Sequence, residues 1–214
     1  MRKRESNTYS VWSPEFAYVI GLIASDGNLS SSGRHINITS KDLEIIKMAK
    51  KILRLKNKIG RKARGYSKEK KYFVLQFGDM NFYEFLISIG LTPKKSKTIK
   101  EVAVPDEFFR DFLRGCFDGD GSLGTFWHPE SQFPQVRLRI ASASPAFLIW
   151  ILGVVKRLFM IKGGHIHTLK NKSVQMLSFG KADSTRILQL MYYEKSLPAL
   201  SRKRKIAMKL LRGE

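Results

Sequence analysis

The sequence predicts an α+β protein made of two similar units, each with the element order αββαββα. Two observations carry this prediction: the chain repeats itself once, and its short apolar segments alternate with polar residues as strands do. With 214 residues, 43% of them hydrophobic, the chain has enough apolar side chains for one large core or two smaller ones.

The repeat pairs residues that are first 94 and then 102 positions apart. The matching pairs are Gly21 with Gly115, Asp26 with Asp120, Gly27 with Gly121, Ile38 with Ile140, Ser40 with Ser142, and Phe77 with Phe179. The change of offset corresponds to one eight-residue insertion within residues 126–135 (FWHPESQFPQ) of the second copy. A repeat that keeps its register on both sides of one insertion indicates two copies of a single structural unit.

The elements carry their own local signals. The first helix is expected to begin after Ser13, a capping residue, with Pro14 in the first helical position. Ile36 and Ile38 alternate with polar neighbours as a strand requires, and the apolar face of each sheet must be covered by helices. The expected organisation is a basic arm at 1–12, units at 13–91 and 106–196, a proline-bounded linker at 92–105, and a basic helix at 197–214.

The chain is strongly basic, because 39 Lys and Arg against 18 Asp and Glu give a net charge of +21. This surplus favours nucleic acid as the partner, and an acidic membrane surface is the weaker alternative because the basic residues are spread along the chain. One cysteine excludes an internal disulfide, and no apolar run approaches the roughly 20 residues of a membrane-spanning helix. We expect an intracellular, DNA-associated protein of an organelle or of bacterial or archaeal cytoplasm, not a secreted one.

The polar faces of the predicted sheets carry side chains that can contact DNA. Arg137 and Arg139 alternate with apolar residues and therefore leave the same side of their strand, and His165 and His167 do the same. In the first unit the corresponding set is Arg34, Asn37, Thr39, Lys41, Arg61, Arg64, Tyr72 and Gln76. Arg, Asn and Gln can each make two hydrogen bonds to a base edge in the major groove. A solvated sheet face is the alternative, and solvent exposure is also an alternative for the two histidines.

Two acidic residues, Asp26 and Asp120, follow apolar helices at matching positions of the repeat. Gly21 and Gly115 place small residues on one face of each helix, so the two helices can pack closely and bring both carboxylates to one end. Helix C-terminal carbonyls and two carboxylates form an all-oxygen site suited to Mg²⁺. A plain Asp-Gly turn is the alternative for one copy alone, and the duplication favours a function.

These residues resemble the two signature nonapeptides of LAGLIDADG homing endonucleases of the single-chain, two-motif type. The motifs are residues 19–27 (VIGLIASDG) and 113–121 (LRGCFDGDG), and the resemblance covers residues 13–209. It implies that two four-stranded antiparallel sheets form a DNA-binding saddle along the major groove. It also implies a metal-dependent endonuclease that cuts both DNA strands across the minor groove and leaves 3′ overhangs.

The resemblance further implies how the site holds its metal. Asp26 and Asp120 would bind Mg²⁺ and activate the attacking water, and the backbone carbonyls of Ser25 and Gly119 would complete the coordination. We expect Mn²⁺ to substitute for Mg²⁺ and Ca²⁺ to bind without supporting cleavage.

Other positions match the family pattern less closely. Lys95 and Lys203 match lysines that stabilise the charged phosphorus or orient water, although the match could shift to Lys94 or Lys205, and a simple phosphate contact is the alternative. Ser40 and Ser142 stand where Gln or Asn often holds water near the metal. The first motif has Ala24 where a further acidic residue is common, and the second keeps Asp118. None of these departures removes a metal ligand, so activity is expected.

Because both motifs lie in one chain, we expect a monomer that recognises a long, asymmetric double-stranded DNA site. Two alternatives stay open on the same fold: a maturase that binds intron RNA, and a catalytically silent DNA-binding regulator. The sequence gives neither the target nor the genetic context of the reading frame.

Overall fold

The computed structural model describes residues 11–63, 69–127, 130, 135–168 and 173–213. The first unit contains α1 (Pro14–Asp26), β1 (Gly27–Leu29), β2 (His35–Ser40), α2 (Leu43–Ile52), β3 (Ile59–Lys62), β4 (Tyr72–Gly78) and α3 (Met80–Ser88). The second contains α4 (Phe109–Asp120), β5 (Gly121–Phe126), β6 (Gln135–Ser142), α5 (Pro145–Phe159), β7 (His165–Thr168), β8 (Gln175–Phe179) and α6 (Lys181–Met191). The predicted order αββαββα is confirmed in both units.

Three elements lie outside this repeat. The short 3₁₀ helices η1 (Lys95–Lys97) and η2 (Asp106–Phe108) are in the connection between the units, and α7 (Ser201–Arg212) follows the second unit. The connection is packed against the protein, since Ile99 and Val102 are buried and the Ile99 carbonyl accepts a hydrogen bond from the Ser144 hydroxyl. No helix among the described residues is long and apolar enough to cross a membrane.

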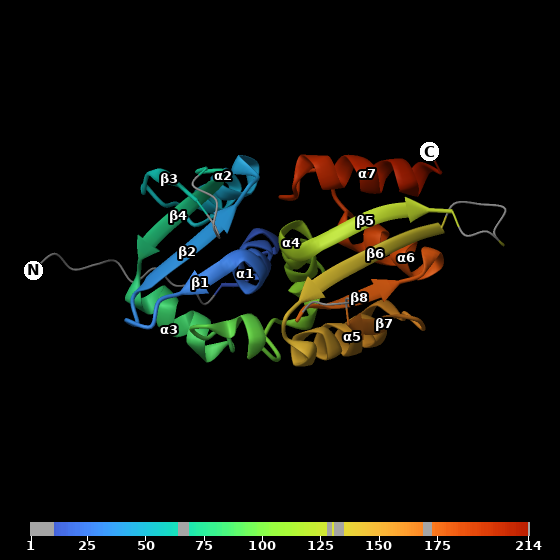
Figure 1. Cartoon of the computed structure of the whole chain (residues 1–214), viewed down its shortest axis with the longest axis horizontal. Coiled ribbons are helices and arrows are strands. Elements are labelled where there is room, and N and C mark those ends of the chain that lie inside the picture. The colour runs from blue at the N-terminus through green and yellow to red at the C-terminus, as the bar shows by residue number, and fades with distance from the viewer. Residues whose placement is uncertain (1–10, 64–68, 128–129, 131–134, 169–172, 214) are drawn as a thin grey trace, which may run out of the picture.

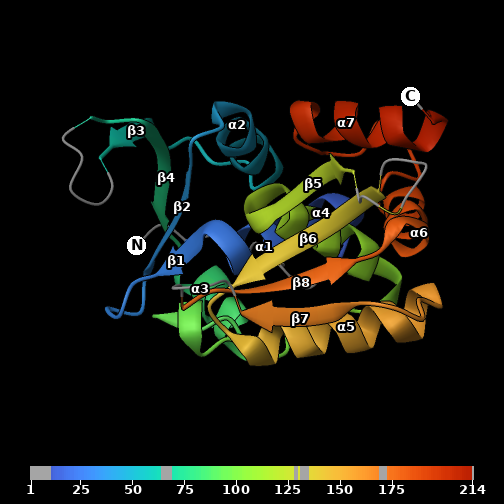
Figure 2. The same ribbon diagram turned by 45° about the vertical axis from the view of Figure 1, so that its right-hand side comes forward.

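The strands form two antiparallel sheets with the same topology. Sheet 1 has the order β1-β2-β4-β3 and sheet 2 the order β5-β6-β8-β7. Helices α2 and α3 pack against sheet 1, and α5 and α6 pack against sheet 2. Figure 1 shows the sheets on either side of α1 and α4, and Figure 2 shows the four strands of sheet 2 lying next to one another.

Helices α1 and α4 pack side by side in the centre of the molecule (Figure 1). They begin differently, because the Ser13 side chain accepts a hydrogen bond from the Phe16 amide at 3.1 Å at the start of α1, whereas α4 continues from η2. Their backbones touch at two glycines. A Cβ on Gly21 would lie 2.1 Å from the Phe112 carbonyl oxygen, and one on Gly115 would lie 2.1 Å from the Tyr18 carbonyl oxygen. The predicted close packing through Gly21 and Gly115 is therefore present.

Candidate active site

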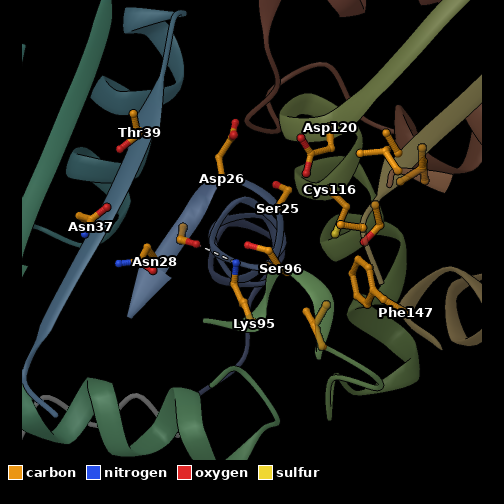
Figure 3. Close-up of a pocket in the computed structure, with 18 of the residues that line it drawn as sticks. Ser25, Asp26, Asn28, Asn37, Thr39, Lys95, Ser96, Cys116, Asp120 and Phe147 are labelled. Atoms are coloured by element: carbon orange, nitrogen blue, oxygen red, sulfur yellow. Dashed lines mark hydrogen bonds between the residues drawn. The ribbon is translucent and has the colours of Figure 1, made fainter. Parts of the chain in front are cut away.

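Asp26 and Asp120 are the last residues of α1 and α4, and both line one cavity of about 650 Å³. Because the two helices lie side by side and end at the same side of the molecule, their C-terminal residues meet there. Figure 3 shows both carboxylates at this cavity, with Ser25 between the two helix ends. Asp26 is half-buried and Asp120 is exposed, so DNA bound over the cavity can reach them.

The two helix ends approach closely at Gly119, the residue before Asp120. A Cβ on Gly119 would lie 2.1 Å from the Ser25 hydroxyl oxygen and 3.4 Å from Oδ2 of Asp26. The Ser25 hydroxyl is turned back to the carbonyls of Gly21 and Leu22, at 3.0 and 3.2 Å. The contact between Ser25 and Gly119 thus brings the Asp26 carboxylate of the first motif next to the backbone of the second motif.

Lys95 and Lys203 lie in equivalent places, each in the segment that follows one of the two units. Nζ of Lys95 donates to the carbonyl oxygen of Gly27 at 2.7 Å, and Nζ of Lys203 donates to that of Gly121, also at 2.7 Å. Gly27 and Gly121 directly follow the two aspartates. The two lysines predicted from the sequence thus make equivalent contacts, and Lys95 lines the cavity whereas Lys203 does not. Lys94 lies just before η1 in a left-handed conformation.

Burial changes the protonation of both lysines. Lys95 and Lys203 are 4% and 5% exposed, and burial lowers the pKa of each to about 8. Negative charge opposes this effect: Asp120 and Asp26 raise the pKa of Lys95, and Asp118 raises that of Lys203. Near pH 7 both ammonium groups are therefore mostly charged.

The donor set at the helix ends fits a hard divalent cation. It consists of the two carboxylates and of the backbone carbonyls at the helix C-termini, all oxygen atoms of the kind that Mg²⁺ and Ca²⁺ prefer. No group of three or more His, Cys, Asp or Glu side chains that could hold a metal ion occurs within the described ranges. A metal here would therefore depend on Asp26, Asp120, carbonyls and water.

Asp118 has a role that the sequence did not reveal. It is buried, and its Oδ2 accepts hydrogen bonds from the Tyr18 hydroxyl at 2.8 Å and from the Leu200 amide at 2.6 Å. Leu200 caps the N-terminus of α7, the helix that carries Lys203. Burial raises the pKa of Asp118 above its usual range, and the two hydrogen bonds oppose the shift. The only sequence signal was an aspartate in the second motif at the position where the first motif has Ala24, and the partners of Asp118 are 100 and 82 residues away.

The two serines predicted to hold water lie in different surroundings. Ser142 lines the cavity, and its hydroxyl accepts a hydrogen bond from the Ser144 amide at 3.1 Å. The Ser40 hydroxyl accepts from the Asp42 amide at 3.2 Å, and Ser40 does not line the cavity. Its neighbour Thr39 does, and the buried Oγ1 of Thr39 has no hydrogen-bond partner among the described residues. In the first unit Thr39 is thus better placed than Ser40 to hold water.

Sheet 1 places most of its predicted DNA-contacting residues on one face. Asn37 lies directly opposite Gln76, and Thr39 and Tyr72 share their face through the same register. The ammonium group of Lys41 lies 5.4 Å from the centroid of the Tyr72 ring. This face, together with its counterpart on sheet 2, is called the polar face below.

Two other predicted residues of the first unit, Arg61 and Arg34, lie elsewhere. The placement of Arg61 on the polar face is wrong, because Arg61 lies opposite Phe73 on the helix-covered face, with its guanidinium 4.7 Å from the ring centroid. The prediction failed because the register of the four-residue strand β3 cannot be deduced from its sequence. Arg34 is exposed in the turn before β2, and Arg64 lies outside the described residues.

Sheet 2 has the predicted alternation. Leu138 and Ile140 are buried, and Arg137 and Arg139 lie on the opposite face. His165 lies in the same cross-strand row as Arg139, and His167 shares its face, with the two imidazole centroids 5.3 Å apart. The placement of these four residues on the polar face is confirmed.

Comparison with known proteins agrees with this architecture. Residues 13–90, which make up the first unit, match the model of the LAGLIDADG-like domain family. No curated protein matches the chain in sequence. Among solved structures, mesophilic variants of the homing endonuclease I-DmoI match with a TM-score of 0.60 and 16% identity, over 91% of this chain and 97% of that one. The LAGLIDADG homing endonuclease I-LtrWI, bound to target DNA, matches with a TM-score of 0.59 and 11% identity, over 92% and 89%.

A protein not described as an endonuclease has the same fold. Full-length DUF199/WhiA from Thermatoga maritima matches with a TM-score of 0.58 and 18% identity over 95% of this chain. The chain spans 62% of the length of that protein. The comparisons establish an α+β fold of two pseudo-symmetric units that matches LAGLIDADG endonuclease structures, and residues rather than fold must decide between cleavage and binding alone.

Proposed function

We propose that this chain, which has the fold of single-chain LAGLIDADG proteins, is a site-specific endonuclease that hydrolyses both strands of DNA with a divalent metal. The observation that supports this proposal most strongly is the meeting of Asp26 and Asp120 at one cavity, with a buried lysine bonded to the glycine that follows each aspartate. A protein that only bound DNA would have no need of paired carboxylates, which repel phosphates, in the centre of a chain of net charge +21.

The substrate in this proposal is double-stranded DNA. The two polar faces supply arginine, lysine, asparagine and glutamine side chains, and structures such as that of I-LtrWI are of homing endonucleases bound to target DNA. Because one chain holds two different units, it would act as a monomer on a long, asymmetric site. DNA lying along both sheets would pass over the cavity between α1 and α4, where the carboxylates are.

In the proposed mechanism Asp26 and Asp120, with the carbonyls of Ser25 and Gly119, would hold Mg²⁺. When bound, the cation supplies Lewis acidity that lowers the pKa of water and stabilises the charge on the leaving oxygen. The carboxylates orient the attacking water, whose oxygen bonds to phosphorus while the bond to the leaving oxygen breaks. Lys95 and Lys203 would each supply positive charge close to one of the two phosphates that are cut, since each ammonium group donates to the carbonyl of the glycine that follows a motif aspartate.

The comparison with WhiA structures favours a second candidate, a DNA-binding regulator that does not cut. Both candidates predict DNA binding through the polar faces, and they differ only at the carboxylates. In a regulator, Asp26 and Asp120 would be replaceable without any loss of function.

The test replaces each aspartate with asparagine, which has nearly the same shape but carries no charge. With Mg²⁺ present, Asp26→Asn and Asp120→Asn should abolish double-strand cleavage of a target selected from a random DNA library, while DNA affinity is retained or rises. Glu84→Gln, which makes the same charge change at an exposed position of α3, is the matched control and should cut normally. Wild-type protein that binds one sequence tightly and leaves it uncut in Mg²⁺ would favour the regulator instead.

A further inference from the structure

The two sheets share one register but differ in the side chains of one cross-strand row on the polar face. In sheet 1 the row runs through Asn28, Asn37 and Gln76, each directly opposite the next. In sheet 2 the same row contains different groups, namely Ser122, Arg139 and Ser178, and it continues to His165 on β7. The row of the first unit thus presents three carboxamides, whereas the equivalent positions of the second unit present one guanidinium between two hydroxyls.

The two rows are equivalent in position. Asn28 lies two residues after Asp26, and Ser122 lies two residues after Asp120, so each row starts at the same step from its motif aspartate. The repeat offset of 102 relates Asn37 to Arg139, and the same cross-strand pairs connect them to their neighbours. DNA bound symmetrically across both sheets would therefore present base pairs at the same distance from the centre to both rows.

The row of sheet 1 carries free amide groups. Asn28 and Gln76 are exposed and Asn37 is half-buried, and none of their side chains hydrogen-bonds to another described residue. Figure 3 shows Asn28 and Asn37 on neighbouring strands beside the cavity. An amide presents one acceptor and one donor in a plane, and this pattern matches N6 and N7 of adenine in the major groove.

The row of sheet 2 carries a guanidinium instead. Arg139 is half-buried and makes no hydrogen bond or ion pair with another described residue. Two residues along the same face, Arg137 stacks on Phe126, with its guanidinium 4.4 Å from the ring centroid, which holds the side chain over the sheet. A guanidinium presents only donors, and paired donors match O6 and N7 of guanine.

We propose that equivalent rows read different bases: the row of Asn28, Asn37 and Gln76 selects adenine, and Arg139 selects guanine at the symmetry-related position. This inference rests on the proposed function only in requiring that DNA lies along both polar faces. It makes the target asymmetric at a defined pair of positions and fixes the orientation in which the chain binds. Arg139 and Asn37 are then the residues that determine specificity at those positions.

The test is a selection of bound DNA from a random duplex library by the full chain in Ca²⁺, followed by sequencing. Wild-type protein should recover a site with A·T at one position and G·C at its symmetry mate, each preferred about 5- to 150-fold, as expected for one bidentate contact. Arg139→Asn should change the preference at the second position from guanine to adenine and leave the first half-site unaltered. Asn37→Arg should make the reverse change in the other half-site.

Two further variants separate base reading from charge. Arg139→Lys keeps the charge, and it should lose the guanine preference while affinity falls little. Arg186→Asn, on the exposed side of α6, removes the same charge away from the polar face and should leave the recovered sequence unchanged. An unaltered sequence logo with Arg139→Asn, or an equal loss of affinity for all sequences, would identify a phosphate contact and overturn the inference.

The outcome is independent of cleavage, which is measured separately in Mg²⁺. A wild-type chain that cuts a defined target but shows no exchange of preference in the variants contradicts the inference alone. A chain that shows the exchange but never cuts contradicts the endonuclease proposal and supports the inference.

Discussion

The two units place a lysine in the same position by different means. In the second unit Lys203 lies on α7, and its Nζ donates to the carbonyls of Phe117, Asp118 and Gly121. In the first unit Lys95 lies on the single turn η1, and the Gly27 carbonyl is the one acceptor found for its Nζ among the described residues. The ammonium group is thus held by a full helix in one unit and by a short turn in the other.

A buried polar network accounts for the difference. Arg114 donates to the carbonyls of Met191 and Pro198 and to Asp111, and Asp118 accepts from the Leu200 amide, so α4 fixes the segment that leads into α7. The residues equivalent to Arg114 and Asp118 in α1 are Ile20 and Ala24, which have no polar side-chain atoms. The position of the lysine is common to both units, whereas the structure that supports it is not. Substitutions in the two units should therefore have equal effects at the shared positions and unequal effects in the supports.

The largest effect on stability, and the one most nearly equal in the two units, is expected where α1 contacts α4. Gly21→Ala and Gly115→Ala each place a methyl group 2.1 Å from a backbone carbonyl of the facing helix, so each should lower the free energy of unfolding by about 4 kcal/mol or more. Gly153→Ala in α5, where the new Cβ meets no atom within 4 Å apart from its own helix backbone and chain neighbours, is the matched control and should leave stability unchanged or raise it. Thermal or denaturant unfolding measures all three. A large difference between the first two variants would contradict the symmetric packing.

The next largest effect should distinguish the cutting of one DNA strand from the cutting of the other. Lys95→Met and Lys203→Met should each slow the cut of one strand by about 100-fold, because each removes the ammonium group that donates to the glycine carbonyl after one motif aspartate. The two variants should nick opposite strands, which denaturing gels of duplexes labelled on one strand would show. Lys205→Met serves as the control, since this residue of α7 is exposed. If both variants slowed both strands equally, the assignment of one lysine to each cut would be wrong.

Loss of the hydrogen bonds that hold the start of α7 should affect the lysine that follows the second unit and not the one that follows the first. Asp118→Ala leaves the Tyr18 hydroxyl and the Leu200 amide without an acceptor and should lower the free energy of unfolding by about 3 kcal/mol. Tyr18→Phe removes only one of the two hydrogen bonds and should lower it by about 1 kcal/mol. In folded Asp118→Ala protein, cutting of the strand assigned to Lys203 should slow more than that of the other strand. Equal slowing would show that Asp118 does not act through α7.

The difference in stability between wild type and Lys203→Met should depend on pH. Burial lowers the pKa of Lys203 in the folded chain from 10.5 to about 8, so between these values the unfolded chain holds a proton that the folded chain has released. The contribution of Lys203 to stability therefore increases as pH rises from 8 to 10, by about 2 kcal/mol. Denaturant titrations of wild type and Lys203→Met at both pH values, with EDTA, should show this shift in the difference between them. A difference that does not change with pH would mean that Lys203 is not buried as a cation.

Much of the fold could be predicted because the repeat and the alternation of apolar residues are local signals. Gly21 with Gly115 and Asp26 with Asp120 could be matched by their offset alone, and this match placed both aspartates at one end of a helix pair. The face of Arg61 could not be predicted, because it depends on how β3 pairs with β4. The contact of Asp118 with Leu200 joins residues 82 positions apart, and no local pattern encodes such a pair.

The central claim is that the two motif aspartates make this chain a metal-dependent DNA endonuclease. The most direct test incubates the full chain with its selected target, labelled on either strand, in Mg²⁺ and in Ca²⁺. The account predicts that both strands are cut in Mg²⁺ to leave 3′ overhangs, that Ca²⁺ supports binding alone, and that Asp26→Asn with Asp120→Asn leaves the duplex intact. A target that is bound tightly and selectively yet stays whole in Mg²⁺ would contradict the claim.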